Sequence, residues 1–195
     1  MLKEKLQGYK VILASGSPRR RQFMKDLNID FEIRLNEVEE IYPENLQGCE
    51  ITDFLAELKS NALADTLEDK EILITSDTIV WHNHEALGKP KDYDDAYTML
   101  SSLSGKTHEV ISSVCLKSKE KSVTFNETTR VTFHEITKEE IKHYLDNYKP
   151  FDKAGAYGIQ EWIGLIAIAK LEGSYNNVVG MPVNKVYHEL IKFVS

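Results

Sequence analysis

The stretch Leu-Ala-Ser-Gly-Ser-Pro-Arg-Arg-Arg at residues 13–21 decides the fold, because it joins a short apolar strand to the start of a helix. Residues 9–13, Tyr-Lys-Val-Ile-Leu, are typical of a buried strand, and the serine and glycine that follow interrupt it. Ser17 is a favourable N-cap and Pro18 a favourable first helical residue, so we expect a helix to begin there. Its free N–H groups and positive dipole would face the same small volume as Ser15, which predicts a phosphate-binding site.

This phosphate site follows neither of the two common mononucleotide patterns, because Gly-x-Gly-x-x-Gly and Gly-Lys-Ser/Thr are both missing from it.

The chain of 195 residues carries 24 Lys and Arg against 31 Asp and Glu, a formal net charge of -7. This acidic balance argues against a nucleic-acid partner, whereas a small phosphorylated substrate stays open if positive charge is concentrated locally.

Cysteine usage and the apolar runs indicate the compartment. Cys49 and Cys115 are the only cysteines, and their spacing fits neither a metal site nor a redox motif, which suits a reducing cytosol. The N-terminal Met-Leu-Lys-Glu-Lys-Leu-Gln is no apolar signal segment, and the longest apolar run, residues 163–169, is too short to span a bilayer. We therefore expect a cytoplasmic protein with no membrane partner.

Predicted strands and helices alternate, which indicates an α/β protein with a long mixed sheet. Helices are expected at 18–27, at 52–62 with Thr52 as cap, at 92–103, from a capping box at 137–140, and from 182; strands are expected at 72–81, 108–116, 122–133, 163–171 and 177–179. No repeat, low-complexity tract or linker stands out. A single domain over residues 1–195 is therefore expected.

Asp77 is the sharpest candidate for chemistry. It follows a run of buried strand residues and lies between two hydroxyl residues, so we expect it at a strand end, where open α/β sheets place their ligands. A carboxylate there can hold a divalent cation or orient a water. The alternative is an Asp that satisfies the N–H groups of a turn.

Two further segments are candidates for substrate contact. Lys89 lies between Gly88 and Pro90, in a rigid turn that fixes the ammonium and suits phosphate, although it could be a solvated loop residue. Residues 151–160 are rich in Gly and Ala, which allow a close approach of backbone to a ligand, and Gln160 offers an amide suited to a base edge. The alternative for this segment is a tight loop without a ligand.

The arginine run and the histidines are weaker candidates for a functional site. Residues 19–21 are three arginines about 100° apart on a helix, so only one or two can line a pocket. His82 and His84 flank a predicted turn without a third ligand nearby, which favours a surface hairpin over a metal pair. His108 is expected to be structural.

With these segments in order, the chain resembles the Maf family of septum-formation-inhibitor-like nucleoside triphosphate pyrophosphatases. The motifs that carry the resemblance run nearly end to end: Leu-Ala-Ser-Gly-Ser-Pro-Arg-Arg at 13–20, Ser-Asp-Thr-Ile-Val at 76–80, Gly-Lys-Pro at 88–90, Leu-Ser-Gly-Lys-Thr-His-Glu-Val at 103–110, Asp-Lys-Ala-Gly-Ala-Tyr-Gly-Ile-Gln at 152–160 and Asn-Val-Val-Gly-Met-Pro at 177–182. The resemblance implies an ITPase-like (Maf/Ham1) architecture: a long twisted mixed sheet flanked by helices, with the active-site cleft between two lobes. It also implies hydrolysis of a nucleoside triphosphate between its first and second phosphates, with Mg²⁺ or Mn²⁺ as cofactor. Such a house-cleaning enzyme removes unwanted nucleotides.

The resemblance further implies roles for single residues. It gives Asp77 as proton acceptor, Arg19, Thr78 and Gln160 as specificity residues of the branch that acts on dTTP and UTP, Ser15, Lys59 and Lys89 as phosphate-binding residues, and Asp77 with Glu40 as metal ligands. Two departures from the family pattern are interpreted as tuning. The family usually has a glycine soon after the Gly-Ile-Gln motif, whereas this chain has Glu161, Trp162 and Ile163 before Gly164, and Ser76 replaces the small residue usual before the Asp-Thr pair.

Two other functions stay open. One is a pyrophosphatase for modified purine nucleotides, with similar architecture but another base pocket. The other is a nucleotide-sensing regulator of division and septum formation with vestigial hydrolysis. The charged set of Asp77, Lys59 and Lys89 favours the enzyme, because sensing needs no general base. The sequence does not decide the oligomeric state, for which a homodimer is one option.

Overall fold

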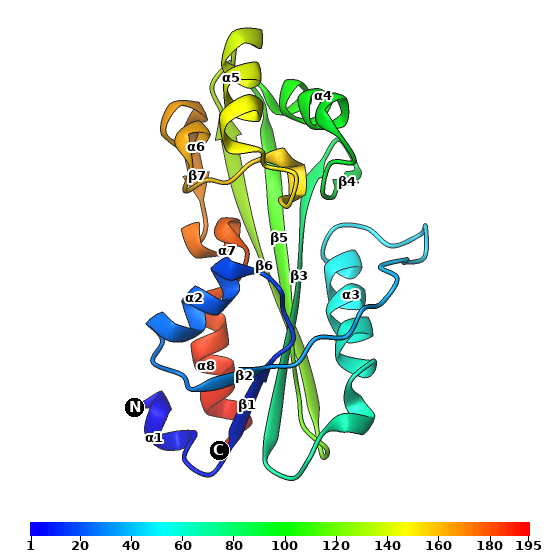
Figure 1. Ribbon diagram of the computed structural model, residues 1–195, viewed down its shortest axis with the longest axis vertical. Coiled ribbons are helices and arrows are strands. Elements are labelled where there is room, and N and C mark those ends of the chain that lie inside the picture. The colour runs from blue at the N-terminus through cyan, green and yellow to red at the C-terminus, as the bar shows by residue number, and fades with distance from the viewer. The chain divides into compact units, whose positions relative to one another are not determined.

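The computed structural model describes residues 1–195 and alternates helices with strands (Figure 1). The helices are α1 (Leu2–Lys5), α2 (Pro18–Asp26), α3 (Cys49–Asn61), the 3-10 turn η1 (Ala64–Thr66), α4 (Tyr93–Leu103), α5 (Lys138–Tyr148), the 3-10 turn η2 (Ala154–Ala156), α6 (Trp162–Ala167), α7 (Tyr175–Val179) and α8 (Val183–Phe193). The strands are β1 (Lys10–Leu13), β2 (Phe31–Ile33), β3 (Glu71–His82), β4 (Glu85–Leu87), β5 (Thr107–Lys117), β6 (Ser122–Phe133) and β7 (Ile168–Glu172). None of these helices combines the length and the apolar character needed to cross a membrane.

The chain forms two compact units, which we call unit 1 and unit 2. Unit 1 comprises Met1–Asp77, Ser112–Asn126 and Gly180–Ser195, and unit 2 comprises Thr78–Ile111 and Glu127–Val179. The strands pair in the order β2-β1-β3-β5-β6-β7, with β4 paired to β3. β1 runs parallel to β2 and β3, whereas β4 and β7 run antiparallel to β3 and β6. The predicted mixed sheet is therefore confirmed.

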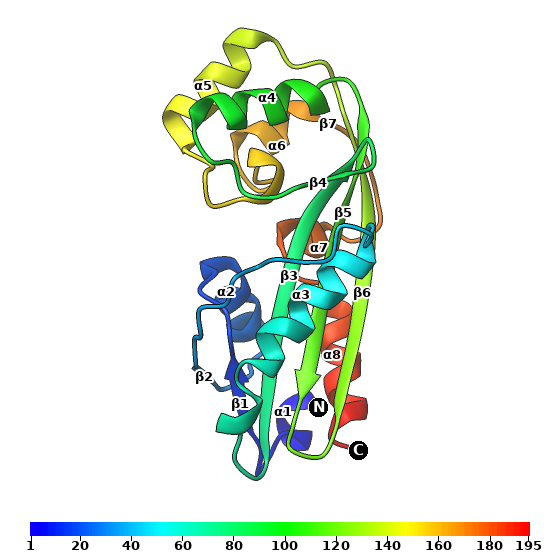
Figure 2. The ribbon, with the colours of Figure 1, turned by 90° about the vertical axis from the view of Figure 1, so that its right-hand side faces the viewer.

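In unit 1, alternating side chains bury both faces of the sheet. Leu13 of β1 lies opposite Ile74 of β3, and both belong to a cluster with residues of α1, α2 and α8. Ile12 and Leu73 point the other way and pack with Leu63, which follows α3. Figure 2 shows α3 on one face of these strands and α8 on the other. Since strand side chains alternate, every second residue of β3 counted from Leu73 points toward α3.

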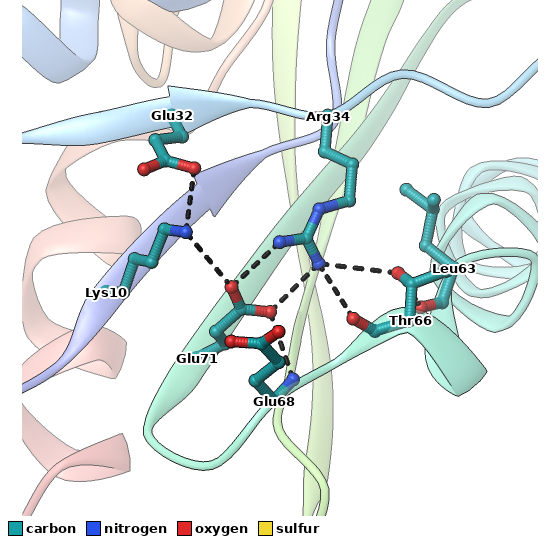
Figure 3. A network of polar contacts seen from close by, with 7 residues as sticks. All are labelled: Lys10, Glu32, Arg34, Leu63, Thr66, Glu68 and Glu71. Carbon is teal, nitrogen blue, oxygen red and sulfur yellow. Dashed lines mark hydrogen bonds and ion pairs between the residues drawn. The ribbon is translucent and has the colours of Figure 1, made fainter.

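A buried carboxylate joins the first three strands of unit 1 (Figure 3). Glu71, the first residue of β3, is 1% exposed and accepts hydrogen bonds from Arg34 Nη1 at 2.9 Å and Nη2 at 2.7 Å. Lys10 of β1 places its Nζ 3.4 Å from Glu71 Oε1 and 2.8 Å from Glu32 Oε2 of β2. The hydrogen bonds from Arg34 lower the pKa of Glu71 to about 2, against the opposing effect of burial.

In unit 2, helices and strands enclose a separate core. Leu100 of α4, Tyr144 of α5 and Ile163 of α6 are all 0% exposed and belong to one cluster. In Figure 2 these three helices lie on the same side of the strands of unit 2. The predicted capping box is confirmed, because Thr137 and Glu140 satisfy each other's backbone N–H groups at the start of α5.

His108 is buried, and His84 lies in a hairpin turn. His108 of β5 is 2% exposed, and its Nε2 lies 2.7 Å from Tyr157 Oη. Burial, with a smaller effect of His82, lowers the pKa of His108 to about 3, so the ring is neutral at physiological pH. Asn83 and His84, at φ 51° and 64°, form the turn between β3 and β4, so the predicted hairpin is confirmed. His82 is only 6% exposed, so the expectation that it lies at the surface is wrong.

The strand predictions near the C-terminus are partly wrong. Residues Trp162–Ala167 form helix α6, only Ile168–Glu172 form a strand, and Tyr175–Val179 form helix α7. A short apolar run does not distinguish a buried strand from a buried helix. Here Ile163 and Ala167, four residues apart, are both buried, as one face of a helix requires.

The predicted cap of α3 is also wrong. The helix begins at Cys49 after Gly48, which has a φ of 53°. Thr52 lies inside the helix, where its hydroxyl donates to the Cys49 carbonyl at 3.1 Å and accepts from Ser113 Oγ at 2.6 Å. A threonine hydroxyl can bond a carbonyl of the preceding turn, so this residue is not confined to the cap position.

Candidate functional site

The loop between β1 and α2 has the local geometry that the sequence predicts. Ser17 caps α2, because its Oγ accepts from the Arg20 N–H at 3.5 Å, and Pro18 is the first helical residue. Ser15 is 6% exposed, and its Oγ accepts from the Ser17 N–H at 3.2 Å. A helix N-terminus and a buried serine therefore adjoin in unit 1, an arrangement that suits an anion.

Asp77 lies within β3 and not at a strand end, so that prediction is wrong. β3 continues to His82, and Val80 beyond Asp77 packs into the core of unit 2. Leu73, Thr75 and Asp77 share the α3 side of the strand, and Thr75 Oγ1 donates to the Ala56 carbonyl of α3 at 2.7 Å. Asp77 is 7% exposed, so its carboxylate reaches α3 from a largely buried position.

Lys59 of α3 connects two carboxylates. Its Nζ lies 2.5 Å from Asp77 Oδ1 and 3.0 Å from Glu40 Oε1. Lys59 follows Ala56 by three residues and thus lies on the same helix face, the face that contacts β3. The Asp77 side chain is 10% exposed and that of Glu40 is 49% exposed, so the cluster extends from the sheet to the surface of unit 1. The shared ammonium offsets the repulsion between the two carboxylates.

Arg20 ties three segments of unit 1 together. Its Nε donates to the Gly180 carbonyl at 2.9 Å, and its Nη1 donates to the Ser76 carbonyl at 2.8 Å and to Ser15 Oγ at 3.5 Å. The Ser76 carbonyl directly precedes Asp77 in β3. Arg20 therefore links the start of α2 to the strand that carries the carboxylate.

Charge interactions place Arg19 in the same neighbourhood. Burial lowers the pKa of Arg20; Asp77 and Glu40 raise it, and Arg19 lowers it. Arg20 is therefore subject to the charges of Arg19, Asp77 and Glu40 within unit 1. The sequence pointed to the arginine run without singling out Arg20, because the helical spacing alone left open which arginine faces inward.

Three predicted site residues, Thr78, Lys89 and Gln160, belong to unit 2. The turn that carries Lys89 is bound to the loop at residues 151–160, because the Gly155 N–H donates to the Gly88 carbonyl at 3.0 Å. Gly155 has a φ of 66°, and a Cβ there would lie 2.7 Å from Val80 Cγ2, so the loop needs glycine at this position.

The residues of unit 1 can contribute to a cation site without forming a complete one. No group of three or more His, Cys, Asp or Glu side chains is clustered so that it could hold a metal ion alone. Asp77 and Glu40 nevertheless supply two carboxylates that share one lysine. Mg²⁺ is commonly held by one or two carboxylates together with substrate phosphates. The donor set therefore fits a divalent cation that arrives with a phosphorylated substrate.

The structure thus groups the candidate residues by unit. Unit 1 holds Ser15, Arg19, Glu40, Lys59 and Asp77, and unit 2 holds Thr78, Lys89 and Gln160. Within unit 1, direct contacts join Lys59 to Asp77 and Glu40. No local sequence pattern indicates these contacts, and Glu40 and Lys59 were expected in the site from the family resemblance alone.

A family model, similar sequences and a solved structure each match nearly the whole chain. The model of the Maf family, described as "Maf-like protein", matches residues 10–193. The chain is 61% identical to a dTTP/UTP pyrophosphatase of Flavobacterium psychrophilum over 191 residues, 98% of either chain. It is 60% identical to a dTTP/UTP pyrophosphatase of Flavobacterium johnsoniae over 194 residues, 100% of either chain. Among solved structures, the Ham1 protein of Staphylococcus aureus has the same fold, with a TM-score of 0.57 and 16% identity over 94% of this chain and 99% of that chain.

Proposed function

Because the chain belongs to the Maf family, we propose that it is a nucleoside triphosphate pyrophosphatase that hydrolyses dTTP and UTP to the monophosphate and pyrophosphate. Relatives that are 60% and 61% identical over essentially the whole chain carry the name dTTP/UTP pyrophosphatase. The structural observation that carries the proposal is the nearly buried Asp77 carboxylate, held 2.5 Å from Lys59 Nζ beside the start of α2.

The proposed reaction is an in-line attack of water on the first phosphorus of the triphosphate. A bond forms between the water oxygen and this phosphorus, the bond to the bridging oxygen breaks, and pyrophosphate leaves with that oxygen. Asp77 is the candidate acceptor for the proton of the water. Positioning and charge neutralisation supply most of the catalysis in phosphoryl transfer, so a carboxylate next to several cations suits this chemistry.

Phosphate binding falls to the cationic and polar groups around Asp77. Ser15, Arg19 and the N–H groups at the start of α2 would hold phosphate oxygens, and Lys59 would bridge the carboxylates and the substrate. Lys89 is the corresponding candidate from unit 2, where its exposed ammonium sits in a fixed turn. These assignments are supported by the family match and by the contacts within each unit.

We propose Mg²⁺ or Mn²⁺ as the cofactor, held by Asp77, Glu40 and the substrate. When bound, such an ion neutralises phosphate charge and acidifies a coordinated water. Glu40→Gln should therefore raise the metal concentration needed for half-maximal activity by about 10-fold, the scale found for weakened metal ligation. Metal binding measured by calorimetry in the presence of a non-hydrolysable triphosphate gives a readout that does not depend on turnover.

Base recognition is proposed for Gln160, with Thr78 and Arg19 as the other members of the specificity set. The Gln160 amide offers one donor and one acceptor side by side, which matches the imide edge of uracil or thymine. Gln160 is exposed, whereas residues 155–159 before it are buried, so its side chain is presented to solvent by a rigid loop.

The decisive experiment is an analysis of products from a panel of nucleoside triphosphates with Mg²⁺ or Mn²⁺. We expect pyrophosphate and the monophosphate in equal amounts, with dTTP and UTP as preferred substrates. Orthophosphate and a diphosphate as first products would refute the reaction. A preference for purine nucleotides would refute the base assignment, and a nucleotide that binds without turnover would favour a regulator.

We also propose that the protein works in the cytoplasm. Both cysteines are free in the structure, with Cys115 buried and Cys49 partly buried, which fits a reducing compartment.

A further inference from the structure

The loop that carries Gln160 is held by unusual backbone geometry. Gly155 and Ala156 both have positive φ, 66° and 58°, and such a conformation is costly for alanine. Residues 155–159 are buried, whereas Gln160 is exposed. The surrounding side chains must therefore fix the path of the loop before the chain reaches Gln160.

Glu161 is the residue through which this part of unit 2 is fixed. One carboxylate oxygen accepts a hydrogen bond from the Tyr144 hydroxyl of α5, and the other lies 3.0 Å from Lys153 Nζ. The Tyr144 oxygen in turn accepts from the Gly158 N–H at 3.0 Å. We call Tyr144, Lys153 and Glu161 the loop clamp.

The loop clamp meets the Gln160 amide at Gly158. A Cβ placed on Gly158 would lie 3.0 Å from Gln160 Nε2, 3.0 Å from Glu161 Cδ and 3.1 Å from Lys153 Cε. All three side chains thus converge on the space that glycine leaves free. The Gln160 amide therefore borders the same space as the Glu161 and Lys153 side chains.

Each member of the loop clamp supplies something that the others need. Lys153 has a side chain that is 10% exposed, so its charge needs carboxylate partners. Asp152 Oδ1 lies 2.7 Å from its Nζ, and Glu161 supplies the second partner at 3.0 Å. Burial and then the hydrogen bond to Glu161 raise the pKa of Tyr144, so the phenol stays protonated and keeps donating. The Glu161 carboxylate has two oxygens, so one accepts from the Tyr144 hydroxyl while the other pairs with the Lys153 ammonium.

We propose that Glu161 is a positioning residue that sets the orientation of the Gln160 amide through Tyr144 and Lys153, and so sets the preference for pyrimidine nucleotides. This inference rests on the proposed function of Gln160 as the reader of the base. Glu161 is part of a departure from the family pattern, and a residue without a carboxylate at this position could not form the loop clamp. Preorganising a recognition group lowers the cost of ordering it when the substrate binds.

The test compares the ratio of kcat/KM for dTTP to kcat/KM for dATP in single and double variants. Glu161→Gln keeps an acceptor for Tyr144 but loses the charge opposite Lys153, and we expect the ratio to fall about 5- to 10-fold, through dTTP alone. Tyr144→Phe should produce the same change and should also speed hydrogen exchange of the Gly158 amide. In a Gln160→Ala background, Glu161→Gln should leave the ratio unchanged, because it acts through Gln160.

Matched controls exist on the same helix. Tyr148→Phe removes only the hydroxyl of a ring that stacks on Tyr144, with ring centroids 5.2 Å apart, and that lies outside the loop clamp. Glu139→Gln neutralises an exposed carboxylate. Both should leave the ratio as it is.

The outcomes separate this inference from the proposed function. Equal losses for dTTP and dATP in Glu161→Gln, or additive effects in the double variant, would overturn the positioning role and leave base reading by Gln160 intact. An unchanged ratio in Gln160→Ala itself would refute base reading, and the positioning role with it.

Discussion

Lys59 places one ammonium between two carboxylates, 2.5 Å from Asp77 Oδ1 and 3.0 Å from Glu40 Oε1. At the scale of single residues, this contact explains how a nearly buried carboxylate can be accommodated within a strand of the sheet. A carboxylate that is 7% exposed needs a charged or hydrogen-bonding partner, and α3 provides one.

We predict that Asp77→Asn keeps the fold and lowers kcat by about 100-fold or more, the usual scale for loss of a positioned acid–base group. The amide is isosteric and still accepts from Lys59, so circular dichroism and the melting temperature should change little. Asp65→Asn, on the exposed η1 turn, is the matched control and should keep full activity. An unchanged turnover in folded Asp77→Asn would assign Asp77 a structural role.

Residue-level prediction succeeded where chemistry is local and failed where it depends on distant segments. Asp77 could be found because a carboxylate between two hydroxyl residues interrupts an apolar strand. Its partner Lys59 is 18 residues away in sequence, and no local pattern encodes that contact. Arg20 stayed unresolved for a similar reason, because its acceptors at Ser76 and Gly180 are carbonyls that are defined only by the folded chain.

At the scale of elements, the junction of β1, β2 and β3 depends on Glu71. We predict that Glu71→Gln lowers the free energy of unfolding at pH 7 by on the order of 2–3 kcal/mol, since it leaves Arg34 without its charged partner. The folded pKa of about 2 lies below the ordinary value of 4.5, so this stabilisation is complete above pH 4.5 and is lost as the pH falls toward 2. Urea unfolding at pH 7 and pH 3 should show the gap between the two proteins narrowing.

Glu32→Gln is the control for this prediction. Glu32 pairs with Lys10 of the same network, but its side chain is 60% exposed, so its loss should cost little. A loss as large as that of Glu71→Gln would mean that net charge and not the buried contact decides stability.

The second prediction for an element concerns β5 and its buried His108. The folded pKa of about 3 lies below the ordinary value of 6.5, so the folded state binds this proton later than the unfolded state does. His108 therefore costs stability as the pH falls from 6.5 toward 3, by up to about 1.4 kcal/mol per pH unit. His108→Gln can keep a hydrogen bond to Tyr157, and its unfolding free energy should depend less on pH in this range.

The measurement is urea unfolding from pH 7 to pH 4, with exposed His134→Gln as control. If the wild type and His108→Gln lose stability in parallel over this range, the ring of His108 is not responsible for the acid sensitivity.

Element prediction depended on whether a periodic pattern had a competitor. α5 could be placed because a capping box precedes an amphipathic segment, and both signals agree. Residues Trp162–Ala167 have no such second signal, and their continuous apolar character suits a strand as well as a helix. The observed packing of this helix requires glycine at position 164, because a Cβ there would lie 1.8 Å from the Ile159 carbonyl oxygen. That contact could not be foreseen from the sequence.

At the scale of the whole molecule, the chain folds into two units that share strands. Unit 1 and unit 2 have separate hydrophobic clusters, yet β3, β5 and β6 each begin in one unit and end in the other. When one unit unfolds, the ends of these strands that lie in it lose their backbone hydrogen bonds. Unfolding of one unit therefore weakens the strand pairing in the other. We therefore propose that the chain behaves as a single domain.

Cooperative unfolding of residues 1–195 can be tested because the two tryptophans, Trp81 and Trp162, both belong to unit 2. Tryptophan fluorescence then reports on unit 2 alone, whereas far-ultraviolet circular dichroism reports on both units. Leu190→Ala removes a side chain that is 0% exposed in the core of unit 1, at a cost of about 2–5 kcal/mol. We expect this variant to lower the melting temperature by roughly 4–20 °C, and by the same amount for both probes. Leu100→Ala, in the core of unit 2, should likewise move both transitions together. A shift of the circular dichroism transition with an unmoved fluorescence transition in Leu190→Ala would mean that the two units unfold independently.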